Sequence, residues 1–188
     1  MARYDHLHDA DALSVQLSEL LLATADAADP EIDRAVPDLL RTVRERLHMD
    51  VVFVSEFCNG RRVFRYIDAA AGAPELAVGD SSPLEESYCQ RVIDGRLPEL
   101  VIDAASLPAS TGLPPTPFRV GAHLSTPIRL PDGSTYGTLC CFSTAPNPQL
   151  RQRDLSQLKQ CAELVARKVD VAQAAGKVPD WSLVPQAH

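Results

Sequence analysis

Two adjacent cysteines, Cys140 and Cys141, lie in the stretch DGSTYGTLCCFS (residues 132–143), which is typical of a strand that follows a tight turn. Thiols can act as nucleophiles, bind metal ions or form disulfides. Successive side chains of a strand point to opposite faces, so these two thiols cannot bind one metal ion together, and a disulfide between them would strain the backbone. The sequence therefore predicts that Cys141 fills a core, whereas Cys140 can face a cavity as a buried apolar group or as a reactive thiol.

Three further residues could take part in chemistry. Cys89 lies in SSPLEESYCQRVIDG, which reads as a short helix capped by Ser82, and Arg91 lies near it. A helix terminus can lower the pKa of a thiol, although Cys89 would lie nearly two turns from the start, and a packed structural role is the alternative. His123 is the one histidine inside a predicted strand, where it can be a hydrogen-bonded core residue or the polar anchor of a cavity.

A second hairpin determines which of these side chains meet. Residues 120–130 and 135–142 read as strands around Pro131-Asp132-Gly133, and a two-residue turn places Ser125 opposite Cys140. One face then has mixed polarity and suits a cavity wall; it collects His123, Ser125, Arg129, Tyr136, Thr138 and Cys140. The other face is apolar and suits packing under helices; it collects Leu124, Thr126, Ile128, Gly137, Leu139 and Cys141.

A first hairpin precedes it, because residues 50–69 form two β-branched and aromatic runs around Asn59-Gly60. A two-residue turn places Tyr66 on the same face as Phe53. Tyr66 is a further candidate for the cavity wall, with a place in the core as the alternative, because alternation does not tell which face meets the cavity.

Helical patterns flank these strands. Apolar residues recur at helical spacing over residues 13–24 and 30–47, and a longer helix is predicted over about 147–171. That helix carries a seam with 3-4-3-4 spacing, formed by Leu155, Leu158, Ala162, Val165 and Val169. The fold class is α+β: an antiparallel sheet with N- and C-terminal helices on one face, and loops and a short helix over the other, where the family resemblance described below implies a ligand cavity.

Composition limits the partners of the chain. The 188 residues carry a formal net charge of −7 and contain no basic run, which argues against a nucleic-acid partner. No apolar run is long enough to cross a bilayer, so we expect no membrane partner. The N-terminus lacks the pattern of a secretory signal and the five cysteines form no C-x-x-C pair, which favours reduced thiols in a cytoplasmic protein.

The sequence resembles a GAF domain over roughly residues 32–171. The resemblance is densest in PLEESYCQRVIDGRLPELVIDA, in VGAHLSTPIRLPDGSTYGTLCCFS and in LRQRDLSQL at the start of the long helix. It divides the chain into an N-terminal helix (1–28), a GAF domain (29–172) and an irregular tail (173–188). It implies a small-molecule cavity on one side of the sheet and dimerisation through the terminal helices on the other. It also implies a signalling context, such as a cyclic-di-GMP enzyme or a histidine kinase as output domain or partner.

The known chemistries of that family find little support in these residues. None of the five cysteines is adjacent to a histidine, as bilin attachment commonly requires, and GLPPTPFRV lacks the axial histidine of haem-binding members. The Asn-Lys dipeptide of the cyclic-nucleotide pocket is absent as well. Free methionine sulfoxide reductases share this fold, and Cys89 falls near one of their cysteine positions, but FRVGAHLS holds no counterpart of the other.

The sequence thus predicts a non-enzymatic sensory domain that binds a small molecule of unidentified type and relays the signal through the terminal helices of a homodimer. The candidate ligand-binding residues are His123, Ser125, Thr138, Cys140, Tyr66, Cys89 and Arg91. The alternative is a thiol-based redox sensor that uses Cys89 or Cys140, and a third reading is a GAF-fold free methionine sulfoxide reductase. We expect no catalytic residue set and no metal site.

Overall fold

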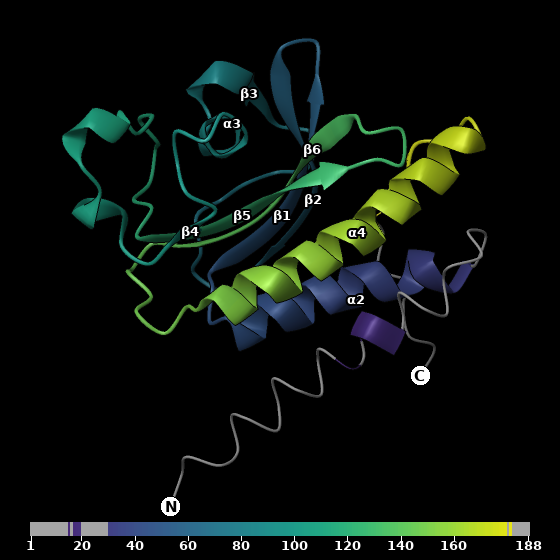
Figure 1. Cartoon of the computed structure of the whole chain (residues 1–188), viewed down its shortest axis with the longest axis horizontal. Coiled ribbons are helices and arrows are strands. Elements are labelled where there is room, and N and C mark those ends of the chain that lie inside the picture. Colours follow the sequence, from purple (N-terminus) through teal and green to yellow (C-terminus); the bar gives the residue numbers. More distant parts are fainter. Residues whose placement is uncertain (1–14, 16, 20–29, 180, 182–188) are drawn as a thin grey trace, which may run out of the picture.

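The computed structural model describes residues 15, 17–19, 30–179 and 181 (Figure 1). Residues 15 and 17–19 are helical, and the rest of the helix predicted over 1–28 lies outside the described residues. The elements in chain order are α2 (Pro30–Arg46), β1 (Val51–Cys58), β2 (Arg61–Ala69), β3 (Ser81–Pro83), the 3-10 turn η1 (Leu84–Glu86), α3 (Tyr88–Ile93), β4 (Leu100–Val101), the 3-10 turns η2 (Ala104–Ser106) and η3 (Ala109–Thr111), β5 (Ala122–Arg129), β6 (Thr135–Ser143) and α4 (Gln152–Ala174).

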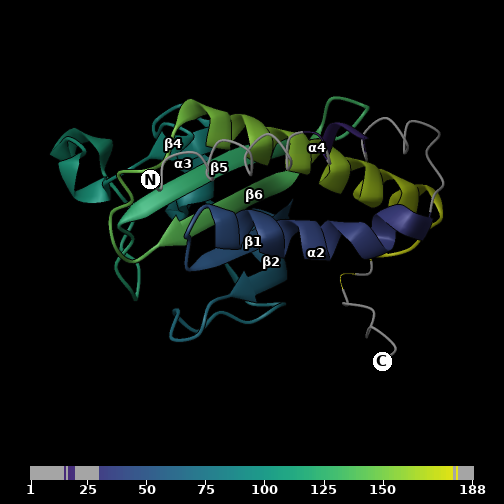
Figure 2. The same cartoon turned by 90° about the horizontal axis from the view of Figure 1, so that it is seen from below.

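The strands form one antiparallel sheet in the order β3-β2-β1-β6-β5-β4. Helices α2 and α4 lie side by side along one face of this sheet, while α3 and the 3-10 turns lie over the other (Figures 1 and 2). The predicted α+β architecture is therefore confirmed. Among the described helices, none combines the length and the apolar character that crossing a bilayer would take.

The two long helices begin where local capping allows. Helix α2 begins at Pro30, which needs no hydrogen bond at the first helical position, and it continues through Pro37 without a break. Helix α4 begins at Gln152, later than predicted, because the Asp154 carboxylate accepts a hydrogen bond from the Arg151 backbone N–H at 2.6 Å. Asn147 instead donates from its side chain to the Leu47 carbonyl at 2.8 Å, which fixes the turn ahead of α4.

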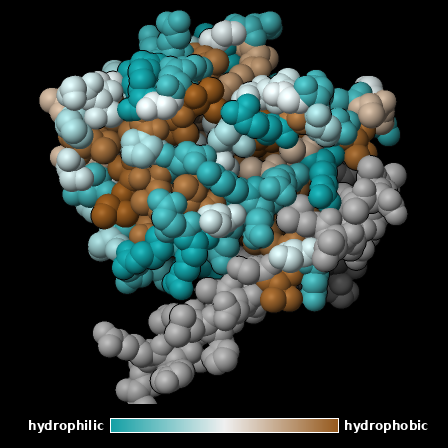
Figure 3. Space-filling model, viewed as in Figure 1, coloured by the Kyte–Doolittle hydropathy of each residue, from teal (hydrophilic) through white to brown (hydrophobic). Residues whose placement is uncertain are grey.

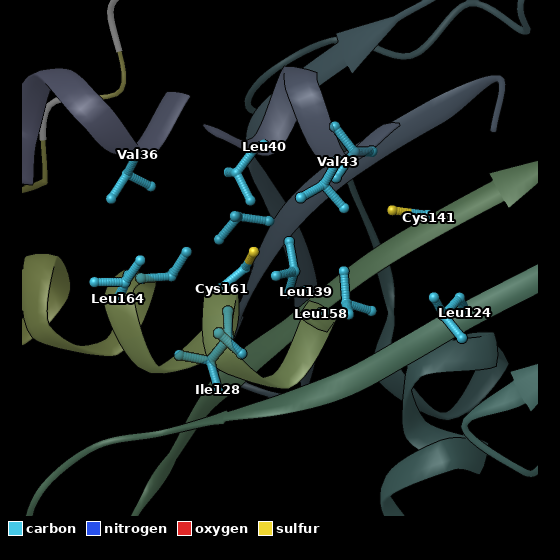
Figure 4. Close-up of a cluster of buried hydrophobic side chains, with 14 of the residues drawn as sticks. Val36, Leu40, Val43, Leu124, Ile128, Leu139, Cys141, Leu158, Cys161 and Leu164 are labelled. Carbon is cyan, nitrogen blue, oxygen red and sulfur yellow. The ribbon is translucent and has the colours of Figure 1, made fainter. Parts of the chain in front are cut away.

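The main core lies between these helices and the sheet (Figure 4). It contains the apolar face predicted for the second hairpin, including Leu139 and Cys141, so Cys141 fills a core as predicted. Cys161 of α4 points into the same core, where burial raises its pKa to about 12.

The seam of α4 packs within the domain. Its five residues are at most 6% exposed and belong to the helix-side core: Leu155, Leu158, Ala162, Val165 and Val169. The seam thus covers the domain's own sheet and does not present a surface to a second copy. The 3-4-3-4 spacing, taken alone, no longer supports the predicted homodimer.

A bulge in the first hairpin changes the expected face of Tyr66. The turn itself is as predicted, since Asn59 and Gly60 both have positive φ and connect β1 to β2. The pairing then shifts between Val54 and Ser55, so Tyr66 lies opposite Val54 and not on the face of Phe53. The Tyr66 hydroxyl donates to the Pro37 carbonyl at 3.0 Å in the helix-side core. The prediction of Tyr66 as a cavity residue is wrong, because the extra residue in β2 reverses the alternation.

A second shift occurs near the end of β5. Ser125 pairs with Cys140 and His123 with Phe142, as predicted. Beyond Ile128 the register changes, so Arg129 lies opposite Thr135 and Tyr136 joins the helix-side core. The alternation therefore predicts the faces correctly along most of the hairpin and fails for Tyr136, next to its turn.

Candidate functional site

The segment that carries Cys89 differs from the single helix predicted for it. Ser82 lies in β3, and the helix begins five residues later with Ser87 as its N-cap, whose hydroxyl accepts a hydrogen bond from the Gln90 N–H at 3.1 Å. The interruption places Cys89 in the first turn of α3, not nearly two turns into a helix. Cys89 is completely buried there.

Cys89 and Cys140 come together beneath α3. Their sulfur atoms lie 3.6 Å apart, and both side chains are fully buried. The Ser125 hydroxyl lies 2.8 Å from the Cys140 sulfur, and the Thr138 hydroxyl lies 3.4 Å from it. A fifth residue, Ser55, extends this group through a contact of 2.9 Å between its hydroxyl and that of Thr138. The structure therefore brings together Ser125, Thr138, Cys140 and Cys89.

Arg62 of β2 supplies the charge beside these thiols. One guanidinium nitrogen donates to the Cys89 sulfur at 3.9 Å, and the other donates to the Ser82 hydroxyl at 3.1 Å. The guanidinium also lies over the ring of Phe64, 4.6 Å from its centroid. The sequence alternation places Arg62 on this face, but it gives no sign that α3 brings a cysteine to it.

The two thiols have different acidities. The pKa of Cys89 is lowered because its sulfur accepts a hydrogen bond from Cys140 and lies close to the positive charge of Arg62. The pKa of Cys140 is raised by burial and by its proximity to Cys89. The contact with the Arg62 guanidinium therefore favours the thiolate form of Cys89.

His123 lies beside this group and is neutral. It is 3% exposed, and burial together with the charge of Arg62 lowers its pKa to about 4. Its ring centroid lies 5.4 Å from that of Tyr88 in α3. The buried Nδ1 atom of His123 has no hydrogen-bond partner among the described residues, and neither does the Nε atom of Arg62.

Arg91 faces away from the thiols. Its guanidinium donates to the carbonyls of Gly112 at 2.9 Å, Glu85 at 3.2 Å and Ser87 at 3.4 Å. It therefore braces the segments around α3 and does not join the thiols, so its role in ligand binding stays a prediction. The basic side chain at the thiols is Arg62, which the sequence reading did not select.

The space between α3 and the sheet face opposite α2 and α4 is called the thiol compartment here. Its polar members are Arg62, Cys89, His123, Ser125, Thr138 and Cys140. Apolar side chains fill the rest of this side: Val51, Phe53, Phe64 and Phe142, with Phe118 stacked on Phe142. These side chains pack closely in the compartment, and neither of the two surface pockets described next is lined by its polar members.

Two surface pockets lie elsewhere. One of about 700 Å³ lies outside η1 and α3 and is lined by residues such as Leu84, Gln90 and Asp94. A smaller one of about 300 Å³ lies beside α4, next to Arg129 and Lys159. Apolar residues also gather on the surface over the region of α3 and β4 (Figure 3). The partly buried Tyr88, Leu107 and Leu113 belong to that region, where they pack against a small core under α3.

Comparisons with known proteins agree with this architecture. The profile of the GAF domain family matches residues 31–169. The free methionine-R-sulfoxide reductase of Neisseria meningitidis, solved with its substrate, is 15% identical with a TM-score of 0.64, over 89% of this chain and 93% of that one. The GAF domain of an Acinetobacter phosphoenolpyruvate-protein phosphotransferase is 16% identical with a TM-score of 0.61, over 94% and 97% of the two chains.

A third similar structure is the phycocyanobilin-bound GAF domain of a cyanobacterial phytochrome, 12% identical with a TM-score of 0.60, over 88% of this chain and 96% of that one. At these identities the likeness concerns the fold. A comparison with curated proteins finds no match.

Proposed function

The chain belongs to the GAF domain family, and from that premise we propose that it is a sensory domain that binds a small molecule in the thiol compartment. The family match spans α2 to α4 and so includes every element that encloses this compartment. Two of the similar structures carry a small molecule by their own descriptions, a substrate in one and phycocyanobilin in the other.

The observation that carries this proposal is a pair of buried nitrogen atoms without partners. His123 Nδ1 and Arg62 Nε are both shielded from solvent and make no hydrogen bond to any residue that the structure describes. Leaving such a group unpaired costs about 1 to 3 kcal/mol each, and folded proteins rarely tolerate it without a reason. A small ligand with a hydrogen-bond acceptor, placed between these two side chains, would recover that cost.

Binding requires α3 to move, because side chains now fill the compartment. Helix α3 has only six residues and is flanked by 3-10 turns and irregular segments. Short elements of this kind open at lower free energy than the central strands. We therefore propose that the ligand enters as α3 moves outward, and that His123, Ser125, Thr138, Cys140 and Cys89 contact it together with Arg62.

The signal would cross the sheet through β6. Cys140 lies on the compartment side of this strand, while Leu139 and Cys141 pack under α2 and α4 on the other. A ligand that displaces Cys140 therefore also displaces the strand on which both helices pack.

We further propose a homodimer that uses the outer faces of α2 and α4. Its output would be a cytoplasmic signalling protein, such as a cyclic-di-GMP enzyme or a histidine kinase. Light scattering that reports a monomer at high micromolar concentration would remove the homodimer.

Native mass spectrometry of the purified chain tests the ligand proposal. We expect a small molecule to remain bound, to be released on denaturation, and to be lost from the Arg62→Met variant. Arg61→Met is the matched control, since Arg61 is exposed and its guanidinium bonds Ser81 in neighbouring β3. An absorbance scan of the same sample identifies haem or bilin. A wild-type chain without bound molecules, or equal loss from both variants, would contradict the proposal.

Thiol-based sensing is the second candidate function, and the observation that favours it is the 3.6 Å distance between the sulfur atoms of Cys89 and Cys140.

An enzymatic role as a free methionine sulfoxide reductase has weaker support, because the match to that structure concerns the fold and FRVGAHLS holds no second cysteine. We propose that the chain is not this enzyme. Assays of methionine sulfoxide reduction with the wild type and with Cys89→Ser test this, and turnover that depends on Cys89 would overturn it.

A further inference from the structure

The two thiols beneath α3 differ from the other cysteines of the chain. Cys141 and Cys161 lie in the helix-side core, and Cys58 is half-buried at the end of β1. Among the contacts of the described residues, the one between two sulfur atoms joins Cys89 and Cys140, which are separated by 51 positions in the sequence. A disulfide needs sulfur atoms about 2.0 Å apart, so these two sulfur atoms would have to come roughly 1.6 Å closer.

We propose that Cys89 and Cys140 form a reversible intramolecular disulfide on reaction with a hydroperoxide, and that this bond fastens α3 to β6. The proposal deepens the thiol-based candidate function above, since it names both sulfurs, the oxidant class and the element that is held.

The surroundings assign the two sulfurs different roles. Cys89 lies beside the guanidinium of Arg62, which stabilises a thiolate, so Cys89 is the nucleophile. Cys140 has two hydroxyl neighbours, Ser125 and Thr138, and no described cationic side chain contacts its sulfur, so it keeps its proton until the second step. The same guanidinium would oppose a cation between the sulfurs, which favours disulfide formation over binding of a soft metal ion.

The reaction then has two balanced steps. The Cys89 thiolate attacks one oxygen of hydrogen peroxide, the O–O bond breaks, and Cys89 becomes a sulfenic acid while the other oxygen leaves as hydroxide and takes up a proton to form water. The Cys140 sulfur next attacks the sulfenic sulfur, the S–O bond breaks, and a second water leaves with the Cys140 proton. The two thiols lose two electrons and the peroxide gains them. A dithiol such as dithiothreitol returns both electrons and restores the thiols.

Access to the thiols depends on α3. Both sulfurs are fully buried, so peroxide reaches them when α3 opens and not on the closed protein. This is the same movement that the proposed ligand needs. Once the disulfide has formed, α3 can no longer move away from β6. Oxidation and ligand binding should therefore exclude each other, which would make the domain a sensor of ligand only while its thiols are reduced.

Peptide mapping of the full chain tests the bond directly. The reduced protein is treated with a few equivalents of hydrogen peroxide, denatured and alkylated with N-ethylmaleimide. We expect the loss of two alkylated thiols, a mass lower by two hydrogen atoms before alkylation, and a cross-linked peptide that contains Cys89 and Cys140 and disappears with dithiothreitol. The Cys58→Ser variant should give the same result.

Single variants separate the two roles. In Cys140→Ser we expect a sulfenic acid at Cys89 that dimedone captures, whereas Cys140 in Cys89→Ser should stay unmodified at the same peroxide dose. Cooperative thermal unfolding of each variant shows that it is folded. The peptide map of the wild type tests the disulfide even if a variant fails to fold. Oxidation confined to Cys58, the absence of the cross-linked peptide, or dimedone capture at Cys140 in Cys89→Ser would overturn the proposal.

The outcome for ligand binding is measured separately. Native mass spectrometry of the reduced wild type reports the proposed ligand without any peroxide, so that proposal can fail while the disulfide forms. Conversely, if a molecule is bound but no cross-linked peptide forms, only the disulfide proposal fails. If both hold, oxidation of the wild type should lower ligand occupancy, and oxidation of Cys140→Ser should not fasten α3. Full occupancy of the oxidised wild type would overturn the fastening of α3.

Discussion

Cys140 and Cys141 are neighbours in the chain, and their thiols lie in two separate cores on opposite faces of β6. Cys141 is surrounded by the apolar side chains under α2 and α4. Cys140 lies next to the hydroxyls of Ser125 and Thr138. Strand geometry alone therefore gives two equivalent side chains different chemical surroundings.

The first prediction compares serine at these two positions. In Cys141→Ser a hydroxyl is buried among apolar groups, which should lower the free energy of unfolding by about 1 to 3 kcal/mol. In Cys140→Ser the new hydroxyl can bond to Ser125 and Thr138, so the loss should be below about 1 kcal/mol. Urea denaturation of the reduced proteins measures both values. Equal losses would mean that the two faces do not differ in polarity as described.

The second prediction concerns pH. His123 is buried in its neutral form with its pKa lowered to about 4, whereas an unfolded chain binds this proton near pH 6.5. Between these two values the unfolded state binds more protons than the folded state, so stability falls as the pH falls from about 6.5 to about 4. The contribution of His123 over this window is on the order of 3 kcal/mol.

His123→Asn should remove that contribution, so its stability should decline less steeply with acid than that of the wild type. His48→Asn is the matched control, because His48 is exposed and asparagine tolerates its positive φ. Denaturant titrations at several pH values between 4 and 7 provide the measurement. A wild-type slope in His123→Asn would show that His123 is not held neutral.

The alternation of side chains along each strand predicted which face of the sheet most residues point to. The prediction failed where the pairing between strands shifts by one residue. The opposite faces of Leu139 and Cys140 follow from strand geometry, and the structure agrees. Tyr66 and Tyr136 were both placed on the wrong face, because each follows a shift of one residue in the pairing. Such bulges depend on packing between strands, and the one in the first hairpin carries no glycine or proline that would reveal it in the sequence.

The site was predicted in part for a similar reason. Ser125 and Cys140 face each other across one hairpin, so a short-range argument was enough. The contact of Cys89 with Arg62 joins elements from different parts of the chain and depends on where α3 begins. Ser82 followed by Pro83 resembles a helix start, but pairing with β2 draws both residues into β3. Tertiary pairing thus overrode a local capping signal.

The third prediction tests a close approach within the sheet. A Cβ atom built on Gly137 would lie 1.8 Å from the Ser55 carbonyl oxygen, a backbone atom of the neighbouring strand. Gly137→Ala should therefore push β1 and β6 apart and cost about 3 kcal/mol or more. Gly133→Ala is the control; its φ of +84° makes alanine unfavourable by only about 1 kcal/mol, with open space around the new atom. Thermal unfolding that ranks the two variants in the opposite order would contradict the pairing of Ser55 with Thr138 and of Glu56 with Gly137.

The last prediction concerns the charge that acts on Cys89. Arg62→Met keeps a long apolar side chain against Phe53 and Phe64 but removes the guanidinium beside the sulfur. The Cys89 thiolate then loses a stabilising positive charge, so the pKa of Cys89 should rise. The hydrogen bond from Cys140 remains and keeps part of the original lowering.

The ultraviolet absorbance of the thiolate, titrated against pH in the reduced protein, measures this change. Cys89→Ser identifies the signal that belongs to Cys89, and Arg61→Met is the neighbouring control, since the Arg61 side chain bonds Ser81 and its strand partner is Cys58, not Cys89. We expect a shift to higher pH in Arg62→Met and none in Arg61→Met. Because thiolate is the reacting form, Arg62→Met should also slow disulfide formation at neutral pH, and raising the pH should restore the rate. An unchanged titration in Arg62→Met would mean that Arg62 does not lower the pKa of Cys89. The assignment of Cys89 as the nucleophile would then lose the positive charge on which it rests.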